Sequence, residues 1–280
     1  MDEGALRAAS LEHWTRSASG WERRAARVER HAELVTERML AATGLAAGDR
    51  VLEVACGTGG LGLAAARRVA PDGRVLMTDF SPAMVDAARR RVREAAVENI
   101  DVELLDGERL DLPDARMDVV LCRFGLMLMQ DPTAAAREMR RVCAPGGRLA
   151  VAVWGPQQAN PWASLPMTML MSRLGAPPPD PSAPGMFALG DPQKLERAIE
   201  QAGFRDTTVA QVAGVQRHES FEAWWEETRE LTAAFDDLVT AMDAAARERL
   251  MTALRTEAEA FEDDDGLAIP SLALLASAER

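Results

Sequence analysis

The residues best suited to chemistry surround a glycine turn. Gly57-Thr58-Gly59-Gly60 follows the apolar run 51–56 and precedes an alanine- and leucine-rich segment that predicts a helix. Glycine lets the chain reverse tightly and brings backbone N–H groups close to a ligand. Gly57, Gly59 and Gly62 also fit the G-x-G-x-x-G pattern of dinucleotide-binding proteins. The turn alone leaves a nicotinamide, a flavin and other nucleoside ligands open.

Two carboxylates flank this turn. Glu53 stands near the end of the strand before it, where it would repel a pyrophosphate and attract an ammonium group. Asp79 ends the next predicted strand, 74–79, about 20 residues after the first glycine. An ionised carboxylate there can accept both hydroxyl protons of a ribose diol, in NAD or in S-adenosylmethionine. The pair together favours an adenosine ligand that carries an ammonium group.

Four ordered motifs resemble those of the class I S-adenosylmethionine-dependent methyltransferases, in particular the ubiquinone/menaquinone-biosynthesis type of small-molecule enzyme. The motifs are Val51–Gly60, Asp79–Met84, Asp106–Glu108 and Arg141–Arg148, and the match covers roughly residues 45 to 155. The resemblance implies an α/β fold: a doubly wound, Rossmann-like, mostly parallel seven-stranded sheet with an antiparallel closing strand and helical cap insertions. It also implies S-adenosylmethionine as cofactor and S-adenosylhomocysteine as product.

Further candidates lie where predicted strands end. The resemblance places Phe80 and Met84 against an adenine, and Asp106 at the adenine amine, although Asp-Gly is also a strong turn dipeptide. Arg123 could hold the cofactor's carboxylate, an anionic group of the acceptor or a structural ion pair. The predicted cofactor-binding residues are Glu53, Ala55, Gly57, Thr58, Gly59, Asp79, Phe80, Met84, Asp106, Gly107, Glu108 and Arg123.

Four regions follow from these assignments. They are an N-terminal helical flap (1–44) with a break at Ser19-Gly20, a cofactor-binding core (45–154), a proline- and methionine-rich cap insert (155–190), and the remainder of the core (191–280) with a helical insertion at about 219–262. For the flap, a lid over the active site and simple packing both stay open. Eight of the 15 prolines fall in the cap insert, so we expect a cap over the strand ends rather than a regular core element.

The segments outside the core are expected to choose the acceptor. Trp14, Trp21 and Trp162 are the candidate substrate-pocket residues. The resembled family has a tight hairpin where this chain has the insertion, between predicted strands 207–212 and 267–278. Because of this insertion, the sequence does not identify the substrate. It also leaves open whether the chain forms a homodimer through the helical insertions. A run of arginines at 89–93 is expected to be a solvated helix face.

Composition narrows the class of protein. The 280 residues carry a formal net charge of −12, which argues against binding to nucleic acid or to an anionic membrane surface. We expect no membrane insertion, no signal peptide and a cytoplasmic location. Three cysteines without a C-x-x-C pair or histidines at ligand spacing predict neither a metal site nor a disulfide framework.

The sequence thus predicts a methyltransferase that moves a methyl group from S-adenosylmethionine to an O, N or C atom of a small, partly apolar acceptor. No catalytic residue follows from the sequence, and His13 is a weak candidate for a general base. Two alternatives stay open. One is an NAD-dependent oxidoreductase, which Glu53 argues against. The other is a non-catalytic scaffold that binds the nucleoside.

Overall fold

A computed structural model describes residues 3–176 and 183–280, so part of the predicted cap insert, 177–182, lies outside the described residues. The described strands form one sheet in the order β3-β2-β1-β4-β5-β8-β6, with β7 paired to β8. They are β1 (Arg50–Val54), β2 (Arg74–Asp79), β3 (Ile100–Leu104), β4 (Met117–Arg123), β5 (Cys143–Trp154), β6 (Arg205–His218), β7 (Glu262–Asp263) and β8 (Gly266–Glu279).

The direction of the strands confirms the predicted fold class. Strands β1 to β5 pair in parallel, and β8 runs antiparallel between β5 and β6. Because parallel strands end at the same edge of a sheet, the residues that follow β1, β2, β3 and β4 gather along one edge. The predicted site residues lie at this edge. The two-residue β7 is a strand that the sequence did not predict.

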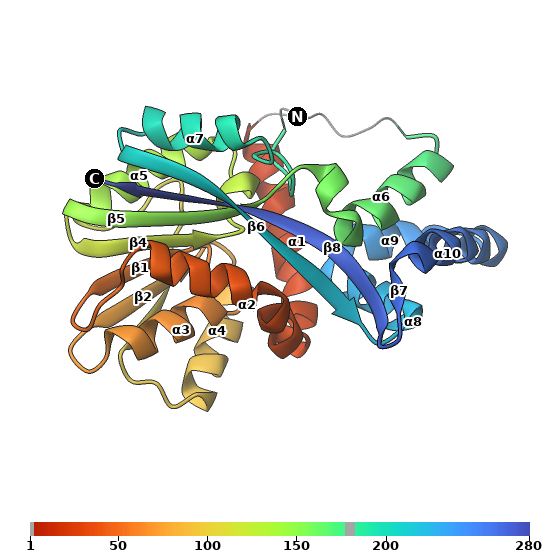
Figure 1. The fold of residues 1–280 in the computed structure, drawn as a ribbon, viewed down its shortest axis with the longest axis horizontal. Coiled ribbons are helices and arrows are strands. Elements are labelled where there is room, and N and C mark those ends of the chain that lie inside the picture. Colours follow the sequence, from red (N-terminus) through yellow and green to blue (C-terminus); the bar gives the residue numbers. More distant parts are fainter. Residues whose placement is uncertain (1–2, 177–182) are drawn as a thin grey trace.

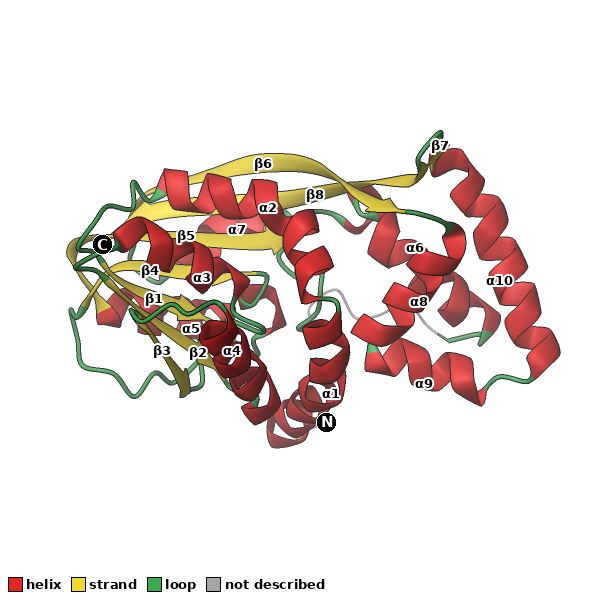
Figure 2. Ribbon diagram, turned by 90° about the horizontal axis from the view of Figure 1, so that it is seen from below, coloured by secondary structure: helices red, strands yellow, loops and turns green. Residues whose placement is uncertain are grey.

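Helices cover both faces of the sheet. Helices α2 and α3 lie on one face and α5 and α7 on the other (Figures 1 and 2). The helices are α1 (Glu3–Arg23), α2 (Ala25–Ala42), α3 (Gly60–Val69), α4 (Pro82–Glu94), α5 (Pro132–Val142), α6 (Pro161–Arg173), α7 (Pro192–Gln201), α8 (Phe221–Leu231), α9 (Ala233–Ala241) and α10 (Ala244–Ala258), with short 3-10 turns η1 (Leu126–Leu128), η2 (Gln157–Ala159) and η3 (Glu259–Phe261). No described helix is long and apolar enough to cross a bilayer.

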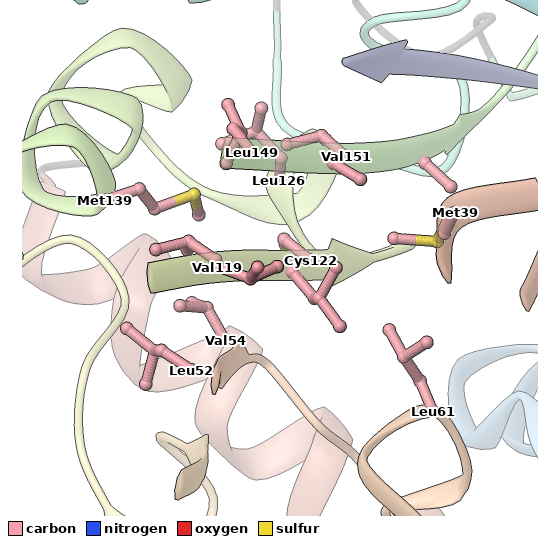
Figure 3. Close-up of a cluster of buried hydrophobic side chains, with 14 of the residues drawn as sticks. Met39, Leu52, Val54, Leu61, Val119, Cys122, Leu126, Met139, Leu149 and Val151 are labelled. Carbon is pink, nitrogen blue, oxygen red and sulfur yellow. The ribbon is translucent and has the colours of Figure 1, made fainter. Parts of the chain in front are cut away.

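The larger of two apolar clusters among the described residues joins the core of the sheet to its helices. Figure 3 shows part of it: Leu52 and Val54 from β1, Val119 from β4, Leu149 from β5 and Met39 from α2. Each of these side chains is at most 1% exposed. Their burial fixes the strands in register and so fixes the positions of the polar residues at the strand ends.

The long strand β6 corrects one predicted boundary. The sequence predicts strands over 207–212 and 267–278; β8 agrees with the second to within one residue at each end, whereas β6 runs from Arg205 to His218. The two strands pair with each other beyond the sheet, with Val215 opposite Pro270. This ribbon extends from the core to the helical insertion (Figure 2). Pairing with β8 satisfies the backbone N–H and C=O groups of residues 213–218 of β6, although the residue types of that segment alone do not predict a strand.

The N-terminal helices differ from the prediction at their break. Helix α1 continues through Ser19-Gly20, and the chain breaks at Arg24 instead. Gly20 is needed for a close approach, because a Cβ at this position would collide with the backbone carbonyl of Glu230 in α8. Helix α1 therefore lies against both α4 of the core and α8 and α9 of the insertion (Figure 2).

The cap insert also differs from the prediction, because it contains a regular helix. Helix α6 accommodates Pro161 at its first position and Pro166 in its interior. It packs against α10 and β8. A second apolar cluster forms there, with Leu170 of α6 beside the buried aromatic side chains of α8 and α9. Helices α8, α9 and α10 lie between β6 and β8, where the sequence predicts a helical insertion.

Candidate functional site

The glycine turn after β1 has an unusual backbone. Gly57 and Gly59 have φ of 53° and 82°, and Ala55 has φ of 55°, a region that alanine rarely adopts. The amide of Gly57 donates to one carboxylate oxygen of Asp79 at 2.9 Å and so holds the turn to β2, and the amide of Ser81 after β2 donates to the other oxygen at 2.9 Å. The residue predicted to bind a ribose therefore also sets the shape of the turn.

Asp79 is buried at this junction, with 6% of its surface exposed. Burial raises its pKa, and the amides of Ser81, Gly57 and Phe80 oppose the rise because they stabilise the ionised form. Ser81 is the N-cap residue of α4, but its side chain makes no cap hydrogen bond. Its backbone amide contacts Asp79 instead, so the cap is linked to the site.

Glu53 provides a buried acceptor beside the turn. Its side chain is 2% exposed, and its Oε2 has no hydrogen-bond partner among the described residues. A Cβ at Gly62 would collide with this oxygen, so the glycine leaves room for the carboxylate. Burial raises the pKa of Glu53 to about 8, against the opposing charge of Arg123. Because a buried carboxylate without a partner is costly, this oxygen fits an ammonium donor.

A pocket of about 410 Å³ lies between α1 and the ends of β2 and β3. Its walls include Phe80, Leu105 and Asp106 from the core and Arg7 and Leu11 from α1. An apolar pocket with one carboxylate at its edge suits a planar heterocycle that carries an amine. Of the two residues predicted to contact adenine, Phe80 lines this pocket, whereas Met84 is 1% exposed and packed inside α4.

The Asp106-Gly107-Glu108 loop is held from several sides. Asp106 accepts the amide of Glu108 at 3.0 Å, and Arg7 forms an ion pair with Asp106 and lies 3.4 Å from Glu108. Glu108 also accepts the amide of Asp131 at the start of α5, at 2.8 Å. A Cβ at Gly107 would collide with Met129 and with Val54 of β1. Glycine is therefore needed for the loop to pack on β1.

Arg123 ends β4 and faces α2. It donates to Glu29 at 2.8 Å and to Thr36 at 2.5 Å, so the ion pair left open by the sequence is present. Only 9% of the Arg123 side chain is exposed. Phe124, the next residue, has φ of 60° and stacks on Trp154 with ring centroids 4.1 Å apart. The carboxyl end of β4 thus brings a cation and an aromatic ring to the site edge.

The predicted substrate-pocket residues fall into two groups. Trp14 and Trp21 of α1 contact each other at 5.7 Å, and Trp21 donates to the carbonyl of Leu231 in the insertion. Trp162 belongs to a separate row, in contact with Trp154 at 4.9 Å. His13 packs edge-on against Trp14 at 5.2 Å, and burial lowers its pKa. A neutral imidazole is the form that a general base requires.

The arginines of α4 are exposed as predicted at Arg89, Arg90 and Arg93, whereas Arg91 is half-buried, and three of the four also contact other elements. Arg91 donates to the backbone and hydroxyl oxygens of Thr58, at 2.7 and 3.1 Å, and so braces the glycine turn. Arg90 pairs with Glu22 of α1, and Arg89 donates to the Val102 carbonyl. Sequence reasoning missed these roles, and those of Arg7 and Glu29. The partners are distant in sequence, and no local spacing marks them.

Comparison with known proteins agrees with this geometry. Residues 51–147 match a family described as a methyltransferase domain. The chain is 40% identical over 134 residues to the ubiquinone/menaquinone biosynthesis C-methyltransferase UbiE of Chromobacterium violaceum, covering 46% of this chain and 52% of that protein. It is 34% identical over 164 residues to the same-named protein of Ralstonia pickettii, covering 56% and 67%.

The chain thus spans about half the length of the first of these relatives. A solved structure of geranyl diphosphate C-methyltransferase from Streptomyces coelicolor superposes with a TM-score of 0.53 and 16% identity, covering 91% of this chain and 81% of that one. At this identity the similarity shows the fold alone, and that fold extends over most of the chain.

Proposed function

Because the chain belongs to the class I S-adenosylmethionine-dependent methyltransferases, we propose that it transfers a methyl group from S-adenosylmethionine to an O, N or C atom of a small, partly apolar acceptor. The observation that carries this proposal is the buried Glu53 Oε2 without a partner, beside the glycine turn that Asp79 holds. A dinucleotide has a pyrophosphate at this turn, whereas an amino-acid-bearing adenosine has an ammonium group that Glu53 can accept.

Each polar part of the proposed cofactor has a matching residue. Asp79 accepts from the ribose hydroxyls, Asp106 accepts from the adenine amine, and Phe80 supplies an apolar wall of the pocket. Glu53 receives the ammonium group, and Arg123, whose charge acts on Glu53, is the candidate cation for the carboxylate.

The bound cofactor supplies an electrophilic methyl group on a sulfonium, so the protein has little bond-making chemistry to add. Its residues have to orient the acceptor in line with that methyl group and to exclude water. Helix α1 covers the adenine side of the edge, and Phe124, Trp154 and Trp162 form an aromatic wall beside it. His13, held neutral by burial, is our candidate for taking a proton from an acidic acceptor.

The names of the relatives favour a carbon acceptor among the three atom types. The ubiquinone/menaquinone biosynthesis enzymes of Chromobacterium violaceum and Ralstonia pickettii are named as C-methyltransferases. We further propose that the flap, the cap insert and the insertion together form the acceptor side, while residues 45–154 form the cofactor side. The acceptor side is rich in aromatic side chains. Such a surface suits a planar or isoprenoid-like apolar acceptor.

Titration calorimetry with S-adenosylhomocysteine and NAD, run in parallel, tests the cofactor. We expect binding of S-adenosylhomocysteine only, and binding of NAD alone would overturn the proposal in favour of an oxidoreductase. Transfer of a labelled methyl group to phenols, amines, quinols and enolisable carbon acids then tests the reaction. Cofactor binding without transfer to any of these acceptors would favour a nucleoside-binding scaffold.

A further inference from the structure

The N-terminal helices make several ionic contacts with the core. Arg7 of α1 pairs with Asp106, Glu22 of α1 pairs with Arg90, Glu29 of α2 pairs with Arg123, and Glu37 of α2 pairs with Arg68 of α3. Asp106 and Arg123 are residues that the proposed function assigns to the cofactor, whereas Arg90 and Arg68 are not. Two of these contacts therefore engage groups that the ligand would also need.

The first of these contacts is at the adenine end of the edge. The Arg7 guanidinium forms an ion pair with one carboxylate oxygen of Asp106, and the other oxygen accepts the Glu108 amide. Arg7 also lines the pocket beside Phe80. An adenine amine placed in this pocket would donate to the same carboxylate. Arg7 is thus a donor from the protein itself at the position of the ligand's donor.

The second contact is at the amino-acid end. The Glu29 carboxylate accepts from Arg123 at 2.8 Å and lies directly over Gly60, where a Cβ would collide with it. Gly60 is the first residue of α3, so this carboxylate sits at a helix N-terminus, where negative charge is favoured. A ligand carboxylate would be stabilised by the same cation and the same helix end. Glu29 is thus an acceptor from the protein itself at the position of the ligand's acceptor.

The ammonium group of the ligand has no such counterpart in the N-terminal helices. No side chain of α1 or α2 donates to Glu53 Oε2, which has no hydrogen-bond partner among the described residues. The nearby charge of Glu29 also raises the pKa of Glu53. The N-terminal helices therefore imitate two of the ligand's groups and disfavour the ionised form of the residue that would bind the third.

We propose that Arg7 and Glu29 compete with the cofactor. Arg7 competes with the adenine amine for Asp106, and Glu29 competes with the cofactor's carboxylate for Arg123 and the N-terminus of α3. The flap then acts as a built-in competitor, which a ligand with both an adenine and an amino-acid carboxylate displaces at both ends. This inference rests on the proposed cofactor and adds to it two residues that set affinity and discriminate between whole and truncated ligands.

Calorimetry on the full chain tests the inference with two ligands. S-adenosylhomocysteine carries both ends, and 5′-methylthioadenosine lacks the amino-acid carboxylate. Arg7→Met should tighten the binding of both ligands, by roughly two- to tenfold. Glu29→Gln should tighten S-adenosylhomocysteine by a similar factor and leave 5′-methylthioadenosine unchanged, because only the former competes for Arg123.

Glu22→Gln is the matched control, because it breaks a contact between flap and core that involves no proposed ligand-binding residue. If loosening of the flap were enough, Glu22→Gln would tighten both ligands as much as the other variants, and the inference would be overturned. Weaker binding in Arg7→Met or Glu29→Gln would overturn it too, since these residues would then hold the ligand. Failure of every protein to bind either ligand would instead overturn the proposed cofactor together with this inference.

Discussion

The core and the helical insertion are both built on buried apolar clusters, but they treat polar groups differently. In the core, Glu53 and Asp79 are almost fully buried, and the backbone around them is strained at Ala55. In the insertion, ion pairs such as Arg229 with Asp236 and Arg255 with Glu222 lie at the surface, and the buried carboxylate of Glu227 is paired with Arg27 of α2. Its interior is dominated by aromatic rings, with Trp225 and Phe235 in edge contact at 5.6 Å.

This difference suggests that the core binds the ligand and that the insertion contributes packing. Buried carboxylates and positive φ angles cost stability, so they persist where a ligand or a tight turn requires them. The insertion carries no comparable cost at its exposed ion pairs, and its aromatic cluster serves packing and the form of the acceptor side. Substitutions in the core should therefore change ligand affinity, and substitutions in the insertion should change stability.

The largest expected effect is in the insertion. Trp224 is 2% exposed and donates from its indole nitrogen to the Trp162 carbonyl at 2.9 Å. Trp224→Ala should lower the free energy of unfolding by about 3–5 kcal/mol in urea titration, because it leaves a large cavity and an unpaired carbonyl. The exposed Leu238→Ala should change it by less than about 0.5 kcal/mol. A clear loss of S-adenosylhomocysteine affinity in folded Trp224→Ala would contradict the separation of the two regions.

In the core, Asp79→Asn should weaken S-adenosylhomocysteine binding by about 100-fold, or roughly 2.7 kcal/mol. An amide has one acceptor oxygen for the Gly57 and Ser81 amides and for two ribose hydroxyls, whereas a carboxylate has two. Asp236→Asn makes the same chemical change in the insertion and should leave the affinity unaltered. Calorimetry at constant pH measures both. Equal affinities of Asp79→Asn and the unmodified protein would remove Asp79 from the binding site.

Glu53, a buried carboxyl group of the core, predicts a pH dependence of binding. Burial raises the pKa of Glu53 to about 8, so its carboxyl group is mostly protonated at pH 6. An ammonium ligand binds the ionised form, and affinity should therefore rise by about tenfold or more between pH 6 and pH 8. Glu53→Gln should remove this rise, and exposed Glu98→Gln should keep it. A slope that survives in Glu53→Gln would assign the titration to another group.

The core was more predictable than the rest because its signals are local. The β1 run, the glycine turn and the carboxylate ending β2 lie within about 30 residues, and periodicity with turn chemistry was enough to place them. The flap contacts were not predictable, since Arg7 reaches Asp106 across the fold. The length of β6 depends on its pairing with β8. The need for glycine at position 20 depends on the close approach of α8. None of these has a signal within a single stretch of residues.

Arg91 gives the smallest and most specific test of this contrast, because its role is invisible in the sequence. It donates to both oxygens of Thr58, while Arg93 on the same helix is exposed. Arg91→Met should weaken S-adenosylhomocysteine binding by roughly threefold, since the turn keeps its bond to Asp79 but loses its brace. Arg93→Met should have no effect in the same titration. Equal effects of the two variants would mean that the positive charge of α4, rather than the contact of Arg91 with Thr58, affects binding. Arg91 would then not belong to the site, which would consist only of residues that the sequence predicts.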